Sequence, residues 1–204
     1  MSVHGLETEV KFYVRNLDRV KSRLEELKAR LIQGRILETN IRFDLPGAPL
    51  RAQGRVLRLR RDTSVKLTYK SASTNEQGVL SREEIEFDVG DFDKAKRFLE
   101  SLGYQKLVYY EKYRTTYELN DSFVMLDELP YGNFVEIEAG TVDLIRTEAH
   151  KLHLKWETAI GTSYNALLDR ARKHLSVAFE DLSFAEFRGI PVEAAHLDVR
   201  AADT

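Results

Sequence analysis

The feature that most constrains the fold is a set of short segments in which apolar and ionic residues alternate. Residues 6–14 (LETEVKFYV), 55–61 (RVLRLRR), 65–70 (VKLTYK) and 82–89 (REEIEFDV) show this pattern. Side chains point alternately to the two faces of a β-strand, so a period of two predicts strands with one apolar and one ionic face. Further strands are expected at 36–45, 107–119, 122–129 and 134–140.

Ionic residues fill one face of these strands, and uncharged polar residues are scarce there. The set consists of Glu7, Glu9, Lys11, Arg58, Arg60, Lys66, Lys70, Arg82, Glu84, Glu86, Lys112, Arg114, Asp127, Glu136 and Glu138. A solvated outer face with cross-strand salt bridges explains any single pair. Repetition over six or more strands favours a sheet closed into a barrel, with the ionic faces in its lumen. The apolar faces, Ile85 and Phe87 among them, are then expected to be buried against helices.

Helices and a loop are expected between the strands. Leucines at helical spacing predict a helix over 17–33. A second helix over 91–103 is expected to have Phe98 and Leu102 on its apolar face. The polar stretch at 71–78 is typical of a flexible loop. Helices are expected from about residue 141 to 175, and the last thirty or so residues form an extension with no predicted structure.

Composition excludes several classes of protein. The 204 residues carry a net charge of -2, so the chain lacks the general positive field of a nucleic-acid-binding protein. It has no cysteine, which excludes disulfides and thiolate zinc sites. No apolar run approaches membrane-spanning length, and the first residues do not resemble a signal peptide. We therefore expect a cytoplasmic protein with no nucleic-acid or membrane partner.

The composition of the ionic faces indicates a ligand. Burying unpaired charges costs several kcal/mol per ion, so such a lumen is expected to be wet, balanced or filled by a ligand. Lysine and arginine side chains match phosphate oxygens, and clustered carboxylates match a hard cation such as Mg²⁺ or Mn²⁺. A polyphosphate with a divalent metal satisfies both sets at once.

Four tyrosines at 109, 110, 113 and 117 have two interpretations. Stacking of a nucleobase at the mouth of the lumen is one. Packing on the outer face of the barrel or at its rim is the other, and we favour it.

Taken together, these segments resemble the CYTH family, also called triphosphate tunnel metalloenzymes. The family's ExExK strand is matched by Glu7-Thr8-Glu9-Val10-Lys11. The other matching motifs, in order, are LRLR (57–60), LTYK (67–70), REEIE (82–86), EKYR (111–114), LDE (126–128) and FVEIE (134–138). The resemblance implies an α+β fold: a closed eight-stranded antiparallel β-barrel, the triphosphate tunnel, with helices packed outside. It predicts a tunnel domain over 1–178 and a C-terminal extension over 179–204.

The resemblance also assigns roles to individual residues. The metal ligands would be Glu7, Glu9, Glu136 and Glu138, with Asp127 acting through a water. The triphosphate clamp would be Lys11, Arg58, Arg60, Lys70, Arg82, Lys112 and Arg114, with Lys66 less firmly assigned. Catalysis would depend on Glu7, Glu9, Lys11, Glu136 and Glu138, and Glu84 and Glu86 would be further tunnel acids.

Several functions fit this resemblance. The leading hypothesis is hydrolysis of tripolyphosphate or of an organic triphosphate such as ATP or thiamine triphosphate, dependent on Mg²⁺ or Mn²⁺. A class IV adenylyl cyclase, which converts ATP to cyclic AMP and pyrophosphate, is the second. A non-catalytic polyphosphate or nucleotide binder and a plain salt-bridged barrel scaffold are the others. The two carboxylates of FVEIE favour the hydrolase, and the resemblance leaves a homodimer open.

Overall fold

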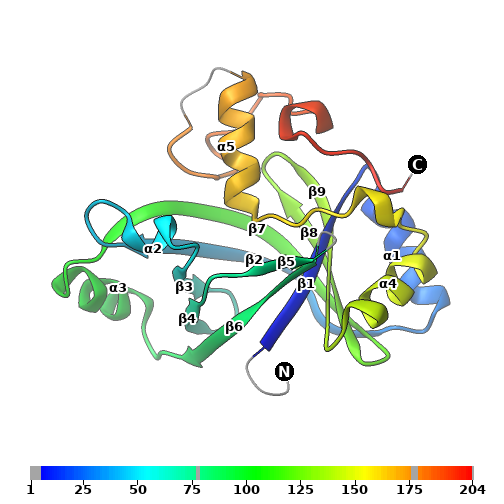
Figure 1. The fold of residues 1–204 in the computed structure, drawn as a ribbon, viewed down its shortest axis with the longest axis horizontal. Helices are drawn as coiled ribbons and strands as arrows, with labels where there is room; N and C mark the ends of the chain where they lie inside the picture. The colour runs from blue at the N-terminus through cyan, green and yellow to red at the C-terminus, as the bar shows by residue number, and fades with distance from the viewer. Residues whose placement is uncertain (1–5, 77–78, 176–178, 204) are drawn as a thin grey trace.

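The structure, a computed structural model, describes residues 6–76, 79–175 and 179–203, and the side chains of residues 6, 7 and 76 lie outside this description. Its strands are β1 (Leu6–Val14), β2 (Arg30–Asp44), β3 (Val56–Arg61), β4 (Val65–Lys70), β5 (Thr74–Glu76), β6 (Val79–Asp88), β7 (Gln105–Leu119), β8 (Ser122–Leu129) and β9 (Gly132–Ala139). They form one sheet in the order β1-β9-β8-β7-β2-β3-β4-β6-β5 (Figure 1). An antiparallel pairing of β1 with β6 closes eight of them into a ring, which confirms the predicted fold.

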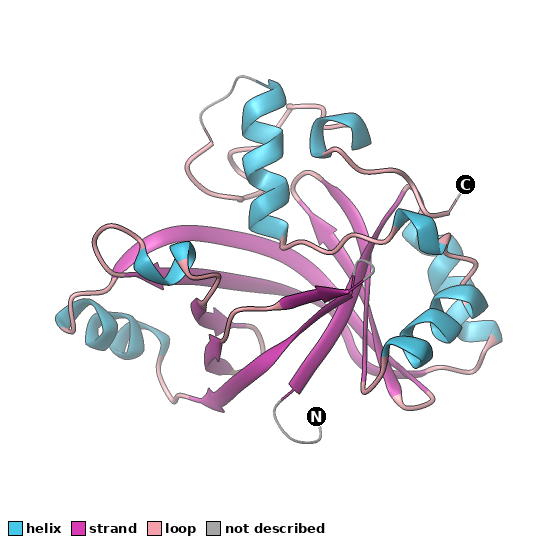
Figure 2. Ribbon diagram, viewed as in Figure 1, coloured by secondary structure: helices cyan, strands magenta, loops and turns pink. Residues whose placement is uncertain are grey.

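The helices lie outside this ring. They are α1 (Leu17–Glu26), α2 (Pro49–Ala52), α3 (Phe92–Ser101), α4 (Val142–Lys151) and α5 (Tyr164–Leu175), with short 3₁₀ helices at Trp156–Thr158 and Ala194–Leu197. Figure 2 shows α1 and α4 together at one end of the molecule and α3 at the other. Among the described residues, no helix combines the length and apolar character that crossing a membrane requires.

The main core forms where α1 and α4 cover one side of the ring. Val10 and Phe12 from β1, Ile137 from β9 and Ile145 from α4 are each at most 1% exposed and belong to one cluster. These positions alternate with the ionic positions of the same strands, so the apolar faces point outward to the helices and the ionic faces point inward. Packing of the helices therefore determines which face lines the interior.

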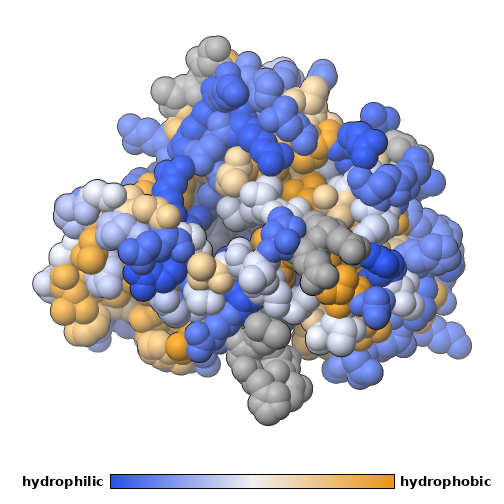
Figure 3. Space-filling view, in the orientation of Figure 1, coloured by the Kyte–Doolittle hydropathy of each residue, from blue (hydrophilic) through white to orange (hydrophobic). Residues whose placement is uncertain are grey.

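The apolar face of β6 is an exception. Ile85 and Phe87 are 51% and 54% exposed, so their predicted burial is wrong. The expected apolar face of the 91–103 helix is also only partly buried, because Leu99 is buried whereas Phe98 and Leu102 are exposed. The reason is the position of α3, which packs against β3 and leaves the outer face of β6 uncovered. Figure 3 shows apolar surface at the α3 end of the molecule.

The helix predicted over 17–33 is shorter than expected. It ends at Glu26, Lys28 takes a positive φ of 57°, and β2 begins at Arg30. Arg30 pairs in register with Glu118 of β7. The long edge of β7 supplies the hydrogen bonds that extend β2, and this tertiary pairing outweighs the local helical pattern.

Two other segments pack against the ring without belonging to it. The predicted loop at 71–78 contains the short strand β5, which pairs with Val79–Ser81 of β6, and residues 77–78 lie outside the described part. In the C-terminal part, backbone bridges join Leu182 to Tyr110 of β7 and Ala201 to Tyr13 of β1. Residues 179–203 thus pack against the ring, and the predicted boundary at 178 falls beside residues 176–178, which the structure does not describe.

Candidate functional site

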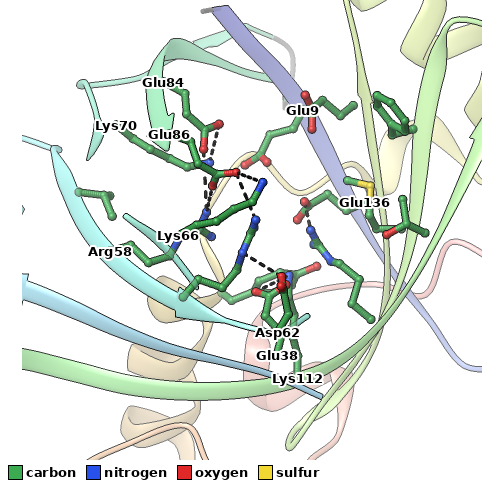
Figure 4. Close-up of a pocket in the computed structure, with 18 of the residues that line it drawn as sticks. Glu9, Glu38, Arg58, Asp62, Lys66, Lys70, Glu84, Glu86, Lys112 and Glu136 are labelled. Carbon is green, nitrogen blue, oxygen red and sulfur yellow. Dashed lines mark hydrogen bonds and ion pairs between the residues drawn. The ribbon is translucent and has the colours of Figure 1, made fainter. Parts of the chain in front are cut away.

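A cavity of about 750 Å³ occupies the interior of the ring, and every strand of the ring contributes to its lining (Figure 4). It brings together twelve of the predicted site residues, namely Glu9, Lys11, Arg58, Arg60, Lys70, Arg82, Glu84, Glu86, Lys112, Arg114, Glu136 and Glu138, and also Lys66. Asp127 lies beneath the lining. The predicted Glu7 side chain lies outside the described residues, although its backbone pairs in register with Arg82.

Acidic residues of β1 and β9 meet across the strand pairing. Glu9 pairs in register with Glu138, and Lys11 pairs with Glu136. The Lys11 Nζ atom lies 2.6 Å from Glu9 Oε1 and 3.3 Å from Glu136 Oε2. Glu9, Lys11 and Glu136 are 6% exposed or less, so this ammonium group holds two nearly buried carboxylates together.

Asp127 of β8 is the anchor beneath this group. Its carboxylate is fully buried and accepts hydrogen bonds from Arg114 Nε (2.6 Å), Arg114 Nη2 (2.6 Å) and Lys112 Nζ (3.1 Å). The Tyr164 hydroxyl donates a fourth, at 2.8 Å. Paired hydrogen bonds from one guanidinium fix its plane, so Asp127 positions Arg114, whose Nη2 atom also reaches Glu136 at 2.9 Å.

The surrounding cations keep the acidic residues ionised. Burial would raise the pKa of Glu136, but Lys11, Arg114 and Lys112 outweigh burial and hold that pKa well below its ordinary value. The pKa of buried Glu38 on β2 is lowered in the same way by Lys112 and Arg114, against the effect of burial. Both carboxylates are therefore available as anions throughout the neutral range.

A second cluster lies on β3, β4 and β6. Glu86 Oε1 is 3.0 Å from Lys66 Nζ and 3.2 Å from Arg60 Nη2, and Glu86 Oε2 is 3.4 Å from Arg58 Nη2. Lys70 Nζ lies 3.3 Å from Glu84 Oε2. Figure 4 shows the labelled side chains of this cluster (Arg58, Lys66, Lys70, Glu84 and Glu86) pointing into the cavity, on the side opposite Glu136. The two clusters therefore present cations to one shared space.

Replacement of Glu86 by glutamine is expected to change stability at acid pH. Burial would raise the pKa of Glu86, but Arg60, Arg58 and hydrogen bonds from Lys66 and Thr68 outweigh it and lower the pKa to about 2. A lowered folded-state pKa gives stability that is present above the ordinary value of 4.5 and lost as the pH falls toward 2. Denaturant unfolding measured from about pH 5 to about pH 2 should show that the free energy of unfolding of Glu86→Gln falls less steeply than that of the wild type. Glu25→Gln, on the exposed face of α1, is the control, and equal declines in all three proteins would contradict the prediction.

The donor chemistry of the first cluster fits a hard divalent cation. Glu9, Glu136 and Glu138 supply only carboxylate oxygens, the ligands that Mg²⁺ and Mn²⁺ prefer. Among the described side chains, no group of three or more potential ligands has metal-binding geometry. Lys11 instead lies between Glu9 and Glu136, where its ammonium group supplies the positive charge that these two carboxylates require.

The lining residues that were not predicted from the sequence include Glu38 and Arg42 of β2, Tyr110 of β7 and Tyr164 of α5. Glu38, Asn40 and Arg42 alternate on one strand face, a signal of the same kind as the motifs that were used. Tyr110, expected on the outer face or rim, is buried and lines the cavity. Strand alternation could not identify Tyr164, because it lies in the first turn of α5, which packs against the ring.

The fold and the cavity define a class of protein: a closed ring of antiparallel strands whose interior presents clustered cations and carboxylates to a charged ligand. Residues 5–155 match the CYTH domain, which is more than half of the chain. The chain therefore belongs to the CYTH domain family.

Individual relatives are distant. A curated Methanocaldococcus jannaschii protein, named "Putative adenylate cyclase MJ0240", is 26% identical over 68% of this chain and 79% of its own length. The structure of a "putative adenylate cyclase" from Vibrio parahaemolyticus matches with a TM-score of 0.71 and 23% identity, over 82% of this chain and 99% of that one. The Hippeastrum protein HpAC1, described as a "putative adenylyl cyclase" with a dominant triphosphatase activity, matches with a TM-score of 0.55 and 19% identity, over 95% and 100%. At these identities the two structures support the fold alone.

Proposed function

We propose that this protein is a metal-dependent hydrolase of a triphosphate, inorganic or organic, that binds inside the ring. One observation carries the proposal: ionic side chains from seven of the eight strands of the ring, all except β8, line the same cavity. The lysine and arginine side chains of the cavity are suited to bind a phosphate chain, and its carboxylates are suited to bind a hard cation.

The charge balance of the cavity supports a metal-bound substrate. Its described lining has nine Lys or Arg and eight Asp or Glu side chains, so these side chains nearly balance in charge. A bare polyphosphate would meet repulsion from the carboxylates, whereas a polyphosphate that carries divalent cations is itself close to neutral. Matched charges on both sides reduce the desolvation cost of binding.

The residues of the cavity would have separate roles in binding and catalysis. Glu9, Glu136 and Glu138 would hold the metal, which when bound lowers the charge on the phosphates and activates water. Arg58, Arg60 and Lys70 would bind phosphate oxygens, and Lys112 and Arg114, fixed by Asp127, would stabilise negative charge that develops on the departing phosphate. Hydrolysis then requires water to attack a terminal phosphorus atom while the bond to the bridging oxygen breaks.

Adenylyl cyclase activity is the second candidate, because the M. jannaschii relative is named for it. In that reaction the ribose 3′-hydroxyl attacks the α-phosphorus and pyrophosphate leaves. The same lining serves both reactions, since each separates phosphates under a clamp of cations. Two adjacent carboxylates on β9, Glu136 and Glu138, favour the hydrolase.

One assay separates these candidates. The purified protein is incubated with Mg²⁺ or Mn²⁺ and, separately, with tripolyphosphate, ATP and thiamine triphosphate, and the products are identified by ³¹P NMR. We expect orthophosphate and the shortened chain. Cyclic AMP with pyrophosphate would establish the cyclase instead, and tight binding without turnover would establish a binding protein.

Replacement of Arg60 by alanine is expected to weaken substrate binding more than it slows chemistry. The guanidinium lies in the cavity beside Glu86 and Asp62, and loss of one charged hydrogen-bonding group should raise KM about 10- to 100-fold. Arg61→Ala is the matched control, because Arg61 is the next residue of β3, is exposed and faces Phe92 outside the ring. A KM unchanged in Arg60→Ala would remove Arg60 from the clamp.

A further inference from the structure

A second cavity of about 390 Å³ adjoins the first and is rich in arginine. Among the residues that the structure describes, its lining includes five arginines, Arg42, Arg51, Arg55, Arg82 and Arg172, and a single acidic residue, Asp169. Arg42 and Arg82 line both cavities, so the two spaces are neighbours across these side chains. Unlike the interior of the ring, this side cavity has a clear excess of positive charge.

Asp169 of α5 is already engaged by two of these arginines. It lies 2.7 Å from Arg51 Nη2 and 2.9 Å from Arg172 Nη1. Arg172 also donates to the carbonyl oxygens of Phe179 and Glu180, at 2.7 Å each. These contacts neutralise Asp169 and satisfy the hydrogen-bond donors of Arg172. They leave the charge of Arg42 without a neighbouring carboxylate.

Arg42 is the unexplained residue. Within the described part of the chain it forms no ion pair, and its buried Nε atom has no hydrogen-bond partner. It lies directly opposite Arg58 in the β2–β3 register, a cross-strand pairing of like charges that destabilises a sheet. Burial lowers its pKa, and the nearby arginines Arg82, Arg51 and Arg58 lower it further, although Tyr110 acts in the opposite direction. An arginine held in this way costs stability unless an anion joins it.

We propose that the side cavity is a second anion subsite in which Arg42 binds a phosphate group. Arg51 and Arg55 flank it, and the cavity also reaches Ser163 and Ala166 at the start of α5. Two sources supply such a group: a fourth phosphate of a chain bound in the ring, or a separate orthophosphate ion. The first source rests on the proposed function, whereas the second does not.

Calorimetric titration of metal-free protein tests the proposal. Orthophosphate, tripolyphosphate and tetrapolyphosphate are titrated into the wild type, Arg42→Gln and Arg35→Gln. Arg35 is the control, because it lies on the same strand and pairs with Glu128 at 2.7 Å, outside both cavities. If the fourth phosphate is the ligand, Arg42→Gln should lose about tenfold or more in affinity for tetrapolyphosphate and keep its affinity for tripolyphosphate. If orthophosphate is the ligand, Arg42→Gln should lose orthophosphate binding alone.

Thermal unfolding gives an independent readout. Without anions, Arg42→Gln should have a Tm equal to or above that of the wild type, because an uncompensated charge is removed. Added orthophosphate or tetrapolyphosphate should raise the Tm of the wild type more than that of Arg42→Gln. Wild-type affinity for all three ligands in Arg42→Gln, or a lower Tm without anions, would overturn the proposal. Absence of tripolyphosphate turnover with Mg²⁺ or Mn²⁺ in the product assay would instead contradict the proposed function, because the orthophosphate titration tests the side cavity separately.

Discussion

Replacement of Glu9 by glutamine is expected to reduce triphosphate turnover by about 100- to 1000-fold. The change keeps the shape of the side chain and removes the negative charge that pairs with Lys11 at 2.6 Å. It therefore removes one carboxylate from the group that would hold the metal, and it frees Lys11 to move toward Glu136. Initial rates with Mg²⁺ and with Mn²⁺ over a range of metal concentrations give the measurement.

The matched control is Glu83→Gln. Glu83 lies on β6, the strand that pairs with β1, but its side chain is exposed and does not line the cavity. Its turnover should equal that of the wild type. If Glu9→Gln retained wild-type turnover and metal dependence, the assignment of the metal to this group of carboxylates would be wrong, although the phosphate clamp would be unaffected.

Replacement of Asp127 by alanine is expected to lower the free energy of unfolding by about 3–5 kcal/mol. The carboxylate is fully buried and is the shared acceptor for Arg114, Lys112 and Tyr164. Its removal leaves two buried cations with less compensation and one buried hydroxyl without its acceptor. Denaturant unfolding at neutral pH measures the loss.

Two further variants make this prediction specific. Asp121→Ala removes an exposed carboxylate from the β7–β8 turn and should change stability by less than about 0.5 kcal/mol. Asp127→Asn keeps the shape of the side chain and one accepting oxygen. Its loss of unfolding free energy should therefore lie between those of Asp121→Ala and Asp127→Ala. A stability loss in Asp127→Ala no larger than that of Asp121→Ala would show that Asp127 is not the anchor of this cluster.

Much of the site followed from alternation within single strands. A period of two is a local property, because successive side chains of a strand point to opposite faces whatever the strand pairs with. The motifs around Lys11, Arg58, Lys112 and Glu136 therefore identified lining residues before any pairing was known. The same rule applied to β2 would have identified Glu38 and Arg42, which carry the ionic pattern on a strand whose motif was not used.

Other features depended on contacts between distant segments. The helix predicted over 17–33 ends early, because the chain from Arg30 onward pairs with the long edge of β7 as part of β2. Ile85 is exposed because α3 packs against β3 and not against the outer face of β6. Neither outcome is encoded in the hydrophobic pattern of the segment itself. Element boundaries and burial of a given face are set by whichever partner is present in three dimensions.

By itself, the sequence determined that this protein has strands with one ionic face, which residues share each face, and that phosphate and a hard cation match them. Only the tertiary structure decided that the ring closes through β1 and β6, that Asp127 lies beneath Arg114 instead of in the lining, and that Arg42 stands between two cavities beside other arginines. The physical reason is that the direction of a side chain follows from its own backbone, whereas its partners follow from register and packing between segments far apart in the chain.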